Sequence, residues 1–273
     1  MKSFAIFAFV LLSCFATLQI LCGQVAATHQ LSAPRVGVIR YASGDVYLLY
    51  GLPGNYVIGP RVRDRVDALS FSERGGLAAR QGSLMLLRPD FSTTASLQTG
   101  ESSPVLGLDS DLTTAIAWLP SAQKLAHWNG QAFVSVSVPD ILREGEVSLV
   151  SKRDDKTAVL TLHSVEGTVT EVTISLETGQ VLSVTTIAGA HGPSYRYQSF
   201  VLCTIDHHLA MVIPADSNIK KLPLIADDWE FEQASSDCLH LRSKATRRDW
   251  LLHFHNGGFD LTELPAPSAE AVK

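Results

Sequence analysis

Three histidines in the last third of the chain could share one metal ion. His253 and His255 lie two residues apart in the apolar run Trp250–His255, and alternate residues of a β-strand point to the same face. His240 belongs to the preceding apolar run and could approach them. Imidazole nitrogens bind zinc and copper, so these histidines form a candidate metal centre.

Several features nevertheless favour ordinary strand histidines at His253 and His255. No Asp, Glu or Cys stands at a spacing that would supply a dependable further ligand, and we assign Asp249 to the preceding turn. We place both histidines in the third strand of a predicted four-stranded unit. That strand lies toward the outside of the fold, away from the dry cavity that a catalytic metal needs. The alternate positions are Leu, Phe and Trp, which offer no partner to fix an imidazole tautomer. We therefore expect no bound metal, no cofactor, and histidines that are dispensable for any hydrolytic activity.

The trio Asp206-His207-His208 places an acid beside two imidazoles. An Asp next to a His is the arrangement of an oriented general base. Adjacent residues of a tight turn rarely point in one direction, however, and this trio lies between two apolar runs. We interpret the three as exposed turn residues, and the sequence identifies no catalytic residue.

The segment Ala188–Tyr197 (AGAHGPSYRY) is the candidate binding surface. It interrupts the regular pattern, contains Gly192-Pro193, and is interpreted as a surface loop. Loops on a rigid scaffold often carry binding residues. We predict Tyr195, Arg196 and Tyr197 as the binding residues, and the alternative is a loop without a binding role.

Motifs of common enzyme classes are missing from the sequence. It contains no GxSxG, HExxH, P-loop, dinucleotide-binding GxGxxG or EF-hand loop, and no Asn-x-Ser/Thr site. The motifs of the sequence therefore specify no enzymatic reaction.

The candidate residues described above are positioned by short apolar runs, and these runs recur along the chain. The segment Val66–Leu97 contains four runs of strand length separated by turn residues, and the same plan returns at least four more times. An acid marks the first turn of each unit: Glu73, Asp111, Asp154, Asp206 and Asp237. Their mean step is about 41 residues, the period of a four-stranded propeller blade. Hydrogen bonding within tight turns explains these acids, and a ring of cation ligands is the alternative.

The N-terminal unit, Val36–Val62, is incomplete. Val36–Tyr41 and Val46–Tyr50 flank a turn that contains glycine, which is a hairpin signal. The fourth unit is weak, because only Asn218–Ile225 follows its second strand. No stretch has the period of an amphipathic helix. We predict an all-β fold: a single β-propeller of five or six four-stranded blades with an incomplete N-terminal unit.

One segment resembles a known family. Leu69–Ala79 (LSFSERGGLAA) is similar to the "fSpdGkyla" segment of β-propeller repeat proteins of the TolB-type and WD-repeat-like groups. The resemblance implies a scaffold used mostly for protein or ligand binding and sometimes for catalysis. It assigns no functional residue to this chain.

The first 27 residues are typical of a secretory signal peptide. Lys2 precedes the apolar stretch Phe4–Cys22, and Val25-Ala26-Ala27 provides small residues for cleavage. An uncleaved membrane anchor, or a lipid anchor on Cys14, is the alternative. We predict a signal peptide over 1–27, a propeller domain over 28–264 and a disordered tail over 265–273. The protein would then be exported to the periplasm or the extracellular space.

Charge and cysteine content narrow the function further. A net charge of −5 without long charged runs argues against nucleic-acid binding and against a polybasic membrane patch. No second apolar stretch long enough to span a membrane follows the signal. We expect Cys203 and Cys238 to be buried and unpaired. The predicted function is an exported binding or interaction module for a protein or small ligand, and the alternative is an exported hydrolase or lyase with its site at the propeller axis.

Overall fold

β-Strands are the only regular secondary structure in the part of the chain that the computed structural model describes, residues 33–109, 114–139, 145–197, 200–213, 218–225, 227–255 and 258–266. The chain divides into two compact units, residues 1–33 and 34–273, and all the strands below belong to the second. No helix able to cross a membrane occurs among the described residues. The all-β prediction is confirmed for these residues, whereas the predicted signal peptide lies outside them.

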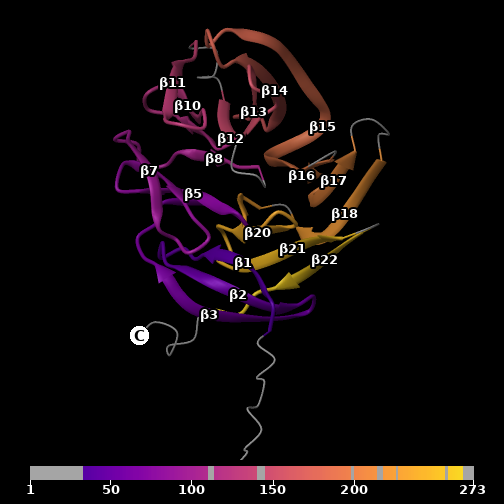
Figure 1. The fold of residues 1–273 in the computed structure, drawn as a ribbon. Coiled ribbons are helices and arrows are strands. Elements are labelled where there is room, and N and C mark those ends of the chain that lie inside the picture. Colours follow the sequence, from indigo (N-terminus) through magenta and orange to yellow (C-terminus); the bar gives the residue numbers. More distant parts are fainter. Residues whose placement is uncertain are drawn as a thin grey trace, which may run out of the picture. The chain divides into compact units, whose positions relative to one another are not determined.

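The strands form five antiparallel sheets (Figure 1). The first sheet contains β1 (Arg35–Arg40), β2 (Val46–Leu52) and β3 (Asn55–Arg63). The second contains β4 (Ala68–Ser72), β5 (Gly75–Arg80), β6 (Ser83–Leu87) and β7 (Thr93–Gln98). The third contains β8 (Val105–Gly107), β9 (Ile116–Leu119), β10 (Lys124–Trp128) and β11 (Phe133–Ser137).

The fourth sheet has seven strands and the fifth has four. The fourth contains β12 (Gly145–Lys152), β13 (Thr157–Ser164), β14 (Thr168–Ser175), β15 (Val181–Tyr197), β16 (Phe200–Ile205), β17 (His208–Ile213) and β18 (Asn218–Ile225). The fifth contains β19 (Trp229–Gln233), β20 (Cys238–Ser243), β21 (Asp249–His255) and β22 (Gly258–Glu263).

The inner strands of the sheets form a closed ring. Strand β4 contacts β8, β8 contacts β12, β12 contacts β15, β15 contacts β19, and β19 contacts β4. The first sheet differs, because its strand β1 contacts β4 and β20 and leaves the direct contact between β19 and β4 in place. This is a propeller-like arrangement of sheets around one axis, with a three-stranded sheet where the sequence predicted an incomplete unit (Figure 1).

Strand β15 takes part in two different strand pairs. Its first half, 181–187, pairs with β14, and its end, 195–197, pairs with β16. Between the halves, Gly189 and Gly192 have φ angles of 74° and 72°, which glycine adopts without the steric cost of a Cβ atom. The interpretation of Ala188–Tyr197 as a surface loop is therefore wrong. Its glycines bend a strand instead of ending it.

This long strand also corrects the predicted fourth unit. The end of β15 is its inner strand, so β16 and β17 are the second and third strands rather than the first and second. The strand that seemed to be missing is present. Asp206 consequently lies in a second turn, at the opposite end of the sheet from Asp154 and Asp237, which do lie in first turns. Asp111 lies outside the described residues.

Close contacts between neighbouring sheets depend on two glycines. A Cβ atom on Gly37 would lie 2.4 Å from the carbonyl oxygen of Ala234, and one on Gly107 would lie 2.0 Å from that of Val150. The amide of Val38 donates a hydrogen bond of 3.0 Å to the same Ala234 oxygen. Any larger residue at these two glycines would push neighbouring sheets apart.

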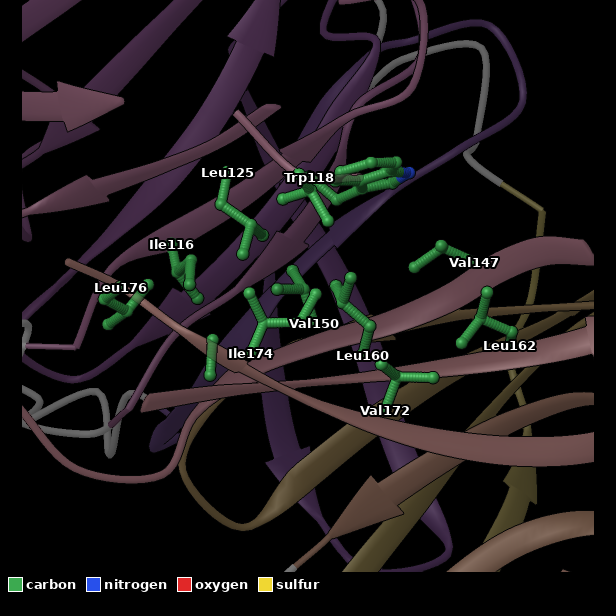
Figure 2. Packing of buried hydrophobic residues seen from close by; sticks show 12 residues of the cluster. Ile116, Trp118, Leu125, Val147, Val150, Leu160, Leu162, Val172, Ile174 and Leu176 are labelled. Carbon is green, nitrogen blue, oxygen red and sulfur yellow. The ribbon is translucent and has the colours of Figure 1, made fainter. Parts of the chain in front are cut away.

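Apolar side chains fill the space between neighbouring sheets. Figure 2 shows the cluster in which Ile116 and Leu125 of the third sheet meet Leu160 and Ile174 of the fourth, all of them fully buried. Strand β9 is buried at every position, as expected for a strand covered on both faces. Burial of each such side chain contributes about 1.5–3 kcal/mol to folding.

Candidate functional site

A cavity of about 820 Å³ lies at one end of the ring axis. Its wall is formed by β8, β12, β15 and the end of β19, together with the turns that follow β12 and β19. These two turns connect inner strands to second strands. The cavity therefore opens at the end of the ring where the first turns of the sheets lie.

All three residues predicted to bind a ligand line this cavity. Tyr195 is 8% exposed, its ring centre lies 5.8 Å from that of Phe231, and burial raises the pKa of its hydroxyl. The Tyr197 ring stacks on Phe254 with 4.2 Å between centres, and its hydroxyl donates a hydrogen bond to the carbonyl oxygen of Ser236. Both tyrosines are therefore held by protein contacts within a strand, which differs from the surface loop predicted from the sequence.

Charged side chains of both signs meet in the same cavity. The acids are Asp109, Glu171 and Asp237, and the bases are Lys152, Arg153 and Arg196. Arg196 forms an ion pair of 2.6 Å with Glu171, and Lys152 forms one of 3.0 Å with Asp155. Arg153 is exposed and forms no ion pair with another described residue, so its guanidinium remains open to a ligand.

A second cavity of about 340 Å³ lies at the other end of the axis. Tyr195 lines both cavities, which places it between the two. The charged residues of the second cavity are mainly acidic: Asp67, Glu146, Asp228, Glu230 and Glu232 stand against Arg40 and Lys244, with His163 beside them.

One wall of the second cavity continues into a buried network of charges. Arg40 of β1 contacts Glu232 of β19 at 2.6 Å. Across the fifth sheet, His240 Nε2 lies 2.7 Å from Asp249, and Arg242 donates to the same carboxylate at 3.0 Å. Arg242 also donates to the main-chain oxygen of Arg40. The network thus joins the first sheet to the fifth.

Neighbouring charges fix the ionisation of this network. Burial opposes the charge on Glu232, but Arg40 and His240 outweigh it and lower the pKa of the carboxyl to about 2. Burial also acts to lower the pKa of His240, yet its hydrogen bond to Asp249 and its ion pair with Glu232 raise that pKa overall. The raised pKa favours the imidazolium form of His240.

The three histidines that the sequence offered as a candidate metal centre are not brought together as one group. His240 is buried and contacts Asp249, and it does not belong to the group of possible ligands around His253. The rings of His253 and His255 are 6.2 Å apart. The placement of Asp249 in a turn is wrong, because it is the first residue of β21.

The premise that no Asp or Cys stands near His253 is also wrong. Cys238 is the direct cross-strand partner of His253, and Asp237 lies 3.3 Å from its Nε2 atom. The ligand atoms of these three side chains all lie within 4.8 Å of one another. In the sequence, Cys238 and His253 are separated by about the length of a β-hairpin, which was the available signal for their proximity. Only the strand register shows that the two residues lie opposite each other.

The Asp206 trio does not form an oriented base. Asp206 pairs with Lys221 at 2.9 Å, and both Asp206 and His207 have positive φ angles typical of turns. Cys203 and Cys238 are both free and buried, as predicted.

Comparisons with known proteins give similarity at the level of architecture. No protein-family model matches the sequence, and no curated protein matches it. Similar solved structures include hydrazine synthase of Kuenenia stuttgartiensis, with a TM-score of 0.47, 12% identity, and coverage of 84% of this chain and 79% of that chain. BamB from Moraxella catarrhalis gives a TM-score of 0.40, 11% identity, and coverage of 84% and 76%.

A further similar structure is PorZ, a bacterial surface component of the type-IX secretion system of Porphyromonas gingivalis. It gives a TM-score of 0.46 and 12% identity, and the match covers 85% of this chain and 31% of that chain. These scores are too low to support conclusions about function. The propeller-like arrangement follows from the sheet topology itself.

Proposed function

We propose that the protein is an exported binding module that holds a small ligand, or a side chain of a partner protein, in the cavity of about 820 Å³. The cavity is the observation that carries the proposal. Its volume is within the range of small-molecule sites, about 300–1,000 Å³. Its mixed lining, with one unpaired guanidinium and two aromatic rings, suits a ligand that has both an anionic and an apolar part.

Each predicted residue has a distinct role in this proposal. Arg153 meets the anionic group of the ligand directly. Arg196 is kept in place by Glu171, and it offers its remaining donors to the cavity. Tyr197 provides an aromatic wall that its stacking on Phe254 holds rigid. Tyr195 forms the floor between the two cavities.

The scaffold is proposed to have six blades. The seven-stranded sheet would count as two blades that share β15, because the two ends of that strand pair with different neighbours. The three-stranded sheet would be the incomplete blade. A density map of the purified protein viewed along its axis tests this count, and five radial sheets instead of six would contradict it.

Export is part of the same proposal, with residues 1–27 as a cleaved signal peptide, 28–264 as the propeller domain and 265–273 as the tail. The destination would be the periplasm or the extracellular space. N-terminal sequencing of protein from the native cells should begin within a few residues of Thr28. An intact Met1 would contradict export by cleavage, and a lipid on Cys14 would indicate the anchored form instead.

The binding test uses the full chain, purified after export, to recover a ligand from an extract of the native cell envelope. The recovered compound is identified by mass spectrometry, and its affinity is then measured with purified material. Removing a charged hydrogen bond costs about 1.5–3 kcal/mol, so Arg153→Ala and Arg196→Ala should each weaken binding by roughly 10–100-fold.

A matched control for these variants is Arg248→Ala. Arg248 is an exposed arginine that follows β20, in a second turn, at the opposite end of the ring from the cavity. The affinity of the Arg248→Ala variant for the ligand should equal that of the unchanged protein. Equal affinities for all three variants would contradict the proposed site.

An exported hydrolase or lyase is the second candidate. Three carboxylates, Asp109, Glu171 and Asp237, line the cavity, and carboxylates serve as general acids and bases. Turnover of the recovered ligand by the unchanged protein would favour this candidate, whereas recovery of the ligand unaltered would favour simple binding.

A further inference from the structure

We infer that Asp237, Cys238 and His253 form a zinc site at the junction of the fifth sheet with the first. Their ligand atoms lie within 4.8 Å of one another. This inference does not depend on the proposed binding function. It reverses the expectation from sequence, which assumed that no Cys or Asp could reach the histidine strand.

Strand register brings two of the ligands together. Cys238 in β20 lies directly opposite His253 in β21, and directly paired residues of antiparallel strands project on the same face with Cβ atoms about 4.5–5.5 Å apart. The same row continues to Asp260 in β22, the cross-strand partner of His253. A carboxylate is therefore available beside the three ligands.

The third ligand is oriented by its own turn. The hydroxyl of Ser235 donates to Asp237 Oδ1 at 2.7 Å, and the main-chain oxygen of Asp237 accepts from the amide of Phe254 at 2.8 Å. The other carboxylate oxygen, Oδ2, is the one that faces His253. A hydrogen bond to the non-ligating oxygen is the support that ligating carboxylates usually have.

Two buried polar atoms at this place have no hydrogen-bond partner among the described residues. They are Nδ1 of His253 and the hydroxyl oxygen of Tyr56. Tyr56 packs in the same buried cluster as Cys238. Unsatisfied buried polar atoms are uncommon in folded proteins and call for an explanation. A bound cation with its water would satisfy them.

The donor set selects the type of metal. One sulfur, one imidazole nitrogen and one carboxylate oxygen suit zinc, whereas magnesium and calcium require oxygen ligands. Zinc bonds of about 2.0–2.3 Å would place tetrahedral ligands roughly 3.3–3.8 Å apart. The three donors need to close by roughly 1 Å, and the fourth position remains for water or Asp260.

Binding exchanges a proton for the metal. A cysteine binds zinc as the thiolate, so its thiol proton must leave when the metal binds. Zinc would displace that proton to solvent and form a zinc–sulfur bond, and no electron is transferred. Affinity should therefore increase with pH, because the ligand must lose its proton.

The test is metal titration of the full chain after treatment with a chelator. We expect about one equivalent of tightly bound zinc, and an absorption band of thiolate-to-metal charge transfer when cobalt(II) takes its place. His253→Gln and Cys238→Ala should each abolish the band and weaken zinc binding at least tenfold. His253 is partly exposed, so its variant should fold even if the Cys238 variant does not.

Two matched variants locate the site. His255→Gln changes the neighbouring histidine, which faces Asp260, and Cys203→Ser changes the other buried thiol. Both should keep the band and the stoichiometry. Binding of well under one equivalent, or a band that survives His253→Gln, would overturn the inference. Loss of binding in His255→Gln together with its retention in His253→Gln would do so as well.

Discussion

Arg40 of β1 and Glu232 of β19, separated by 192 positions in the sequence, form an ion pair of 2.6 Å in which both side chains are nearly buried. The pair connects the N-terminal sheet to the C-terminal sheet. Together with Gly37, which lets β1 approach Ala234, it explains how a three-stranded sheet is held at the junction between β19 and β4.

The first prediction concerns this ion pair. Glu232→Gln should lower the free energy of unfolding by about 3–5 kcal/mol, because it leaves the buried Arg40 with only the more exposed Glu230, 3.9 Å away, as a countercharge. Urea denaturation of the two proteins measures the difference. Replacing Arg40 and Glu232 together by Met should restore much of the loss, since a well-packed apolar pair removes both buried charges.

An exposed ion pair provides the control. Lys244 and Asp228 are 3.0 Å apart, with side chains 44% and 58% exposed. Asp228→Asn should cost no more than about 1 kcal/mol. If the two substitutions cost the same, the network would not be holding the sheets together.

The second prediction is a loss of stability as pH rises. His240 faces Asp249 of β21, Glu232 of β19 and Arg242 of β20. Arg40 of β1 pairs with Glu232, and Glu230 of β19 pairs with Arg242. Its pKa in the folded protein is raised above the ordinary 6.5. The folded state therefore binds more protons than the unfolded state, and stability falls as pH rises above 6.5 through the folded pKa.

Acid should act in the opposite direction through Glu232. Its pKa is lowered from 4.5 to about 2, so its contribution is complete above 4.5 and is lost as pH falls toward about 2. Denaturation midpoints across this pH range measure both slopes. His240→Gln should flatten the alkaline slope, and it should also reduce the acidic slope, because His240 helps to lower the pKa of Glu232. An unchanged alkaline slope would assign that slope to another group.

Sequence patterns predicted the sheets but not all of their pairings. Runs of alternating and consecutive apolar residues marked the strands from β1 to β14 well, because burial on one or two faces determines those patterns. The end of β15 was missed, since Gly192-Pro193 is typical of a loop. Only the pairing of Tyr195 with Leu202 shows that the chain remains in the sheet.

For the candidate sites too, the sequence indicated some of the residues but not the contacts between distant parts of the chain. Tyr195, Arg196 and Tyr197 were chosen as an unusual cluster in a supposed loop, and they line a cavity for a different reason, their position in an inner strand. Partners far apart in the chain, such as Cys238 with His253 or Arg40 with Glu232, depend on register and ring closure. Local spacing indicates at most a hairpin between β20 and β21, and it specifies neither the register nor the closure of the ring.

The third prediction is that Cys203 and Cys238 are both unreactive toward a thiol reagent in the folded, metal-free protein. Both are fully buried and unpaired, and burial raises their pKa values to about 11 and about 12. The reactive thiolate is therefore scarce. Both Cys203 and Cys238 should react after unfolding in denaturant. A peptide that links Cys203 to Cys238 in a non-reduced digest would contradict this.

The fourth prediction tests the close approach of sheets at the axis. Gly107→Ala should destabilise the protein by about 1–3 kcal/mol, the cost of overpacking. The new Cβ would lie 2.0 Å from the main-chain oxygen of Val150, and a backbone atom cannot rotate away as a side chain can. Strand β8 would have to move from β12, and the cavity that both strands line would change shape.

The measurement is a pair of denaturation curves with Gly258→Ala as the matched control, where the nearest atom is 3.2 Å away in the flexible side chain of His255. The control should cost less than about 1 kcal/mol, and equal losses for the two variants would mean that the inner strands are not packed as closely as described.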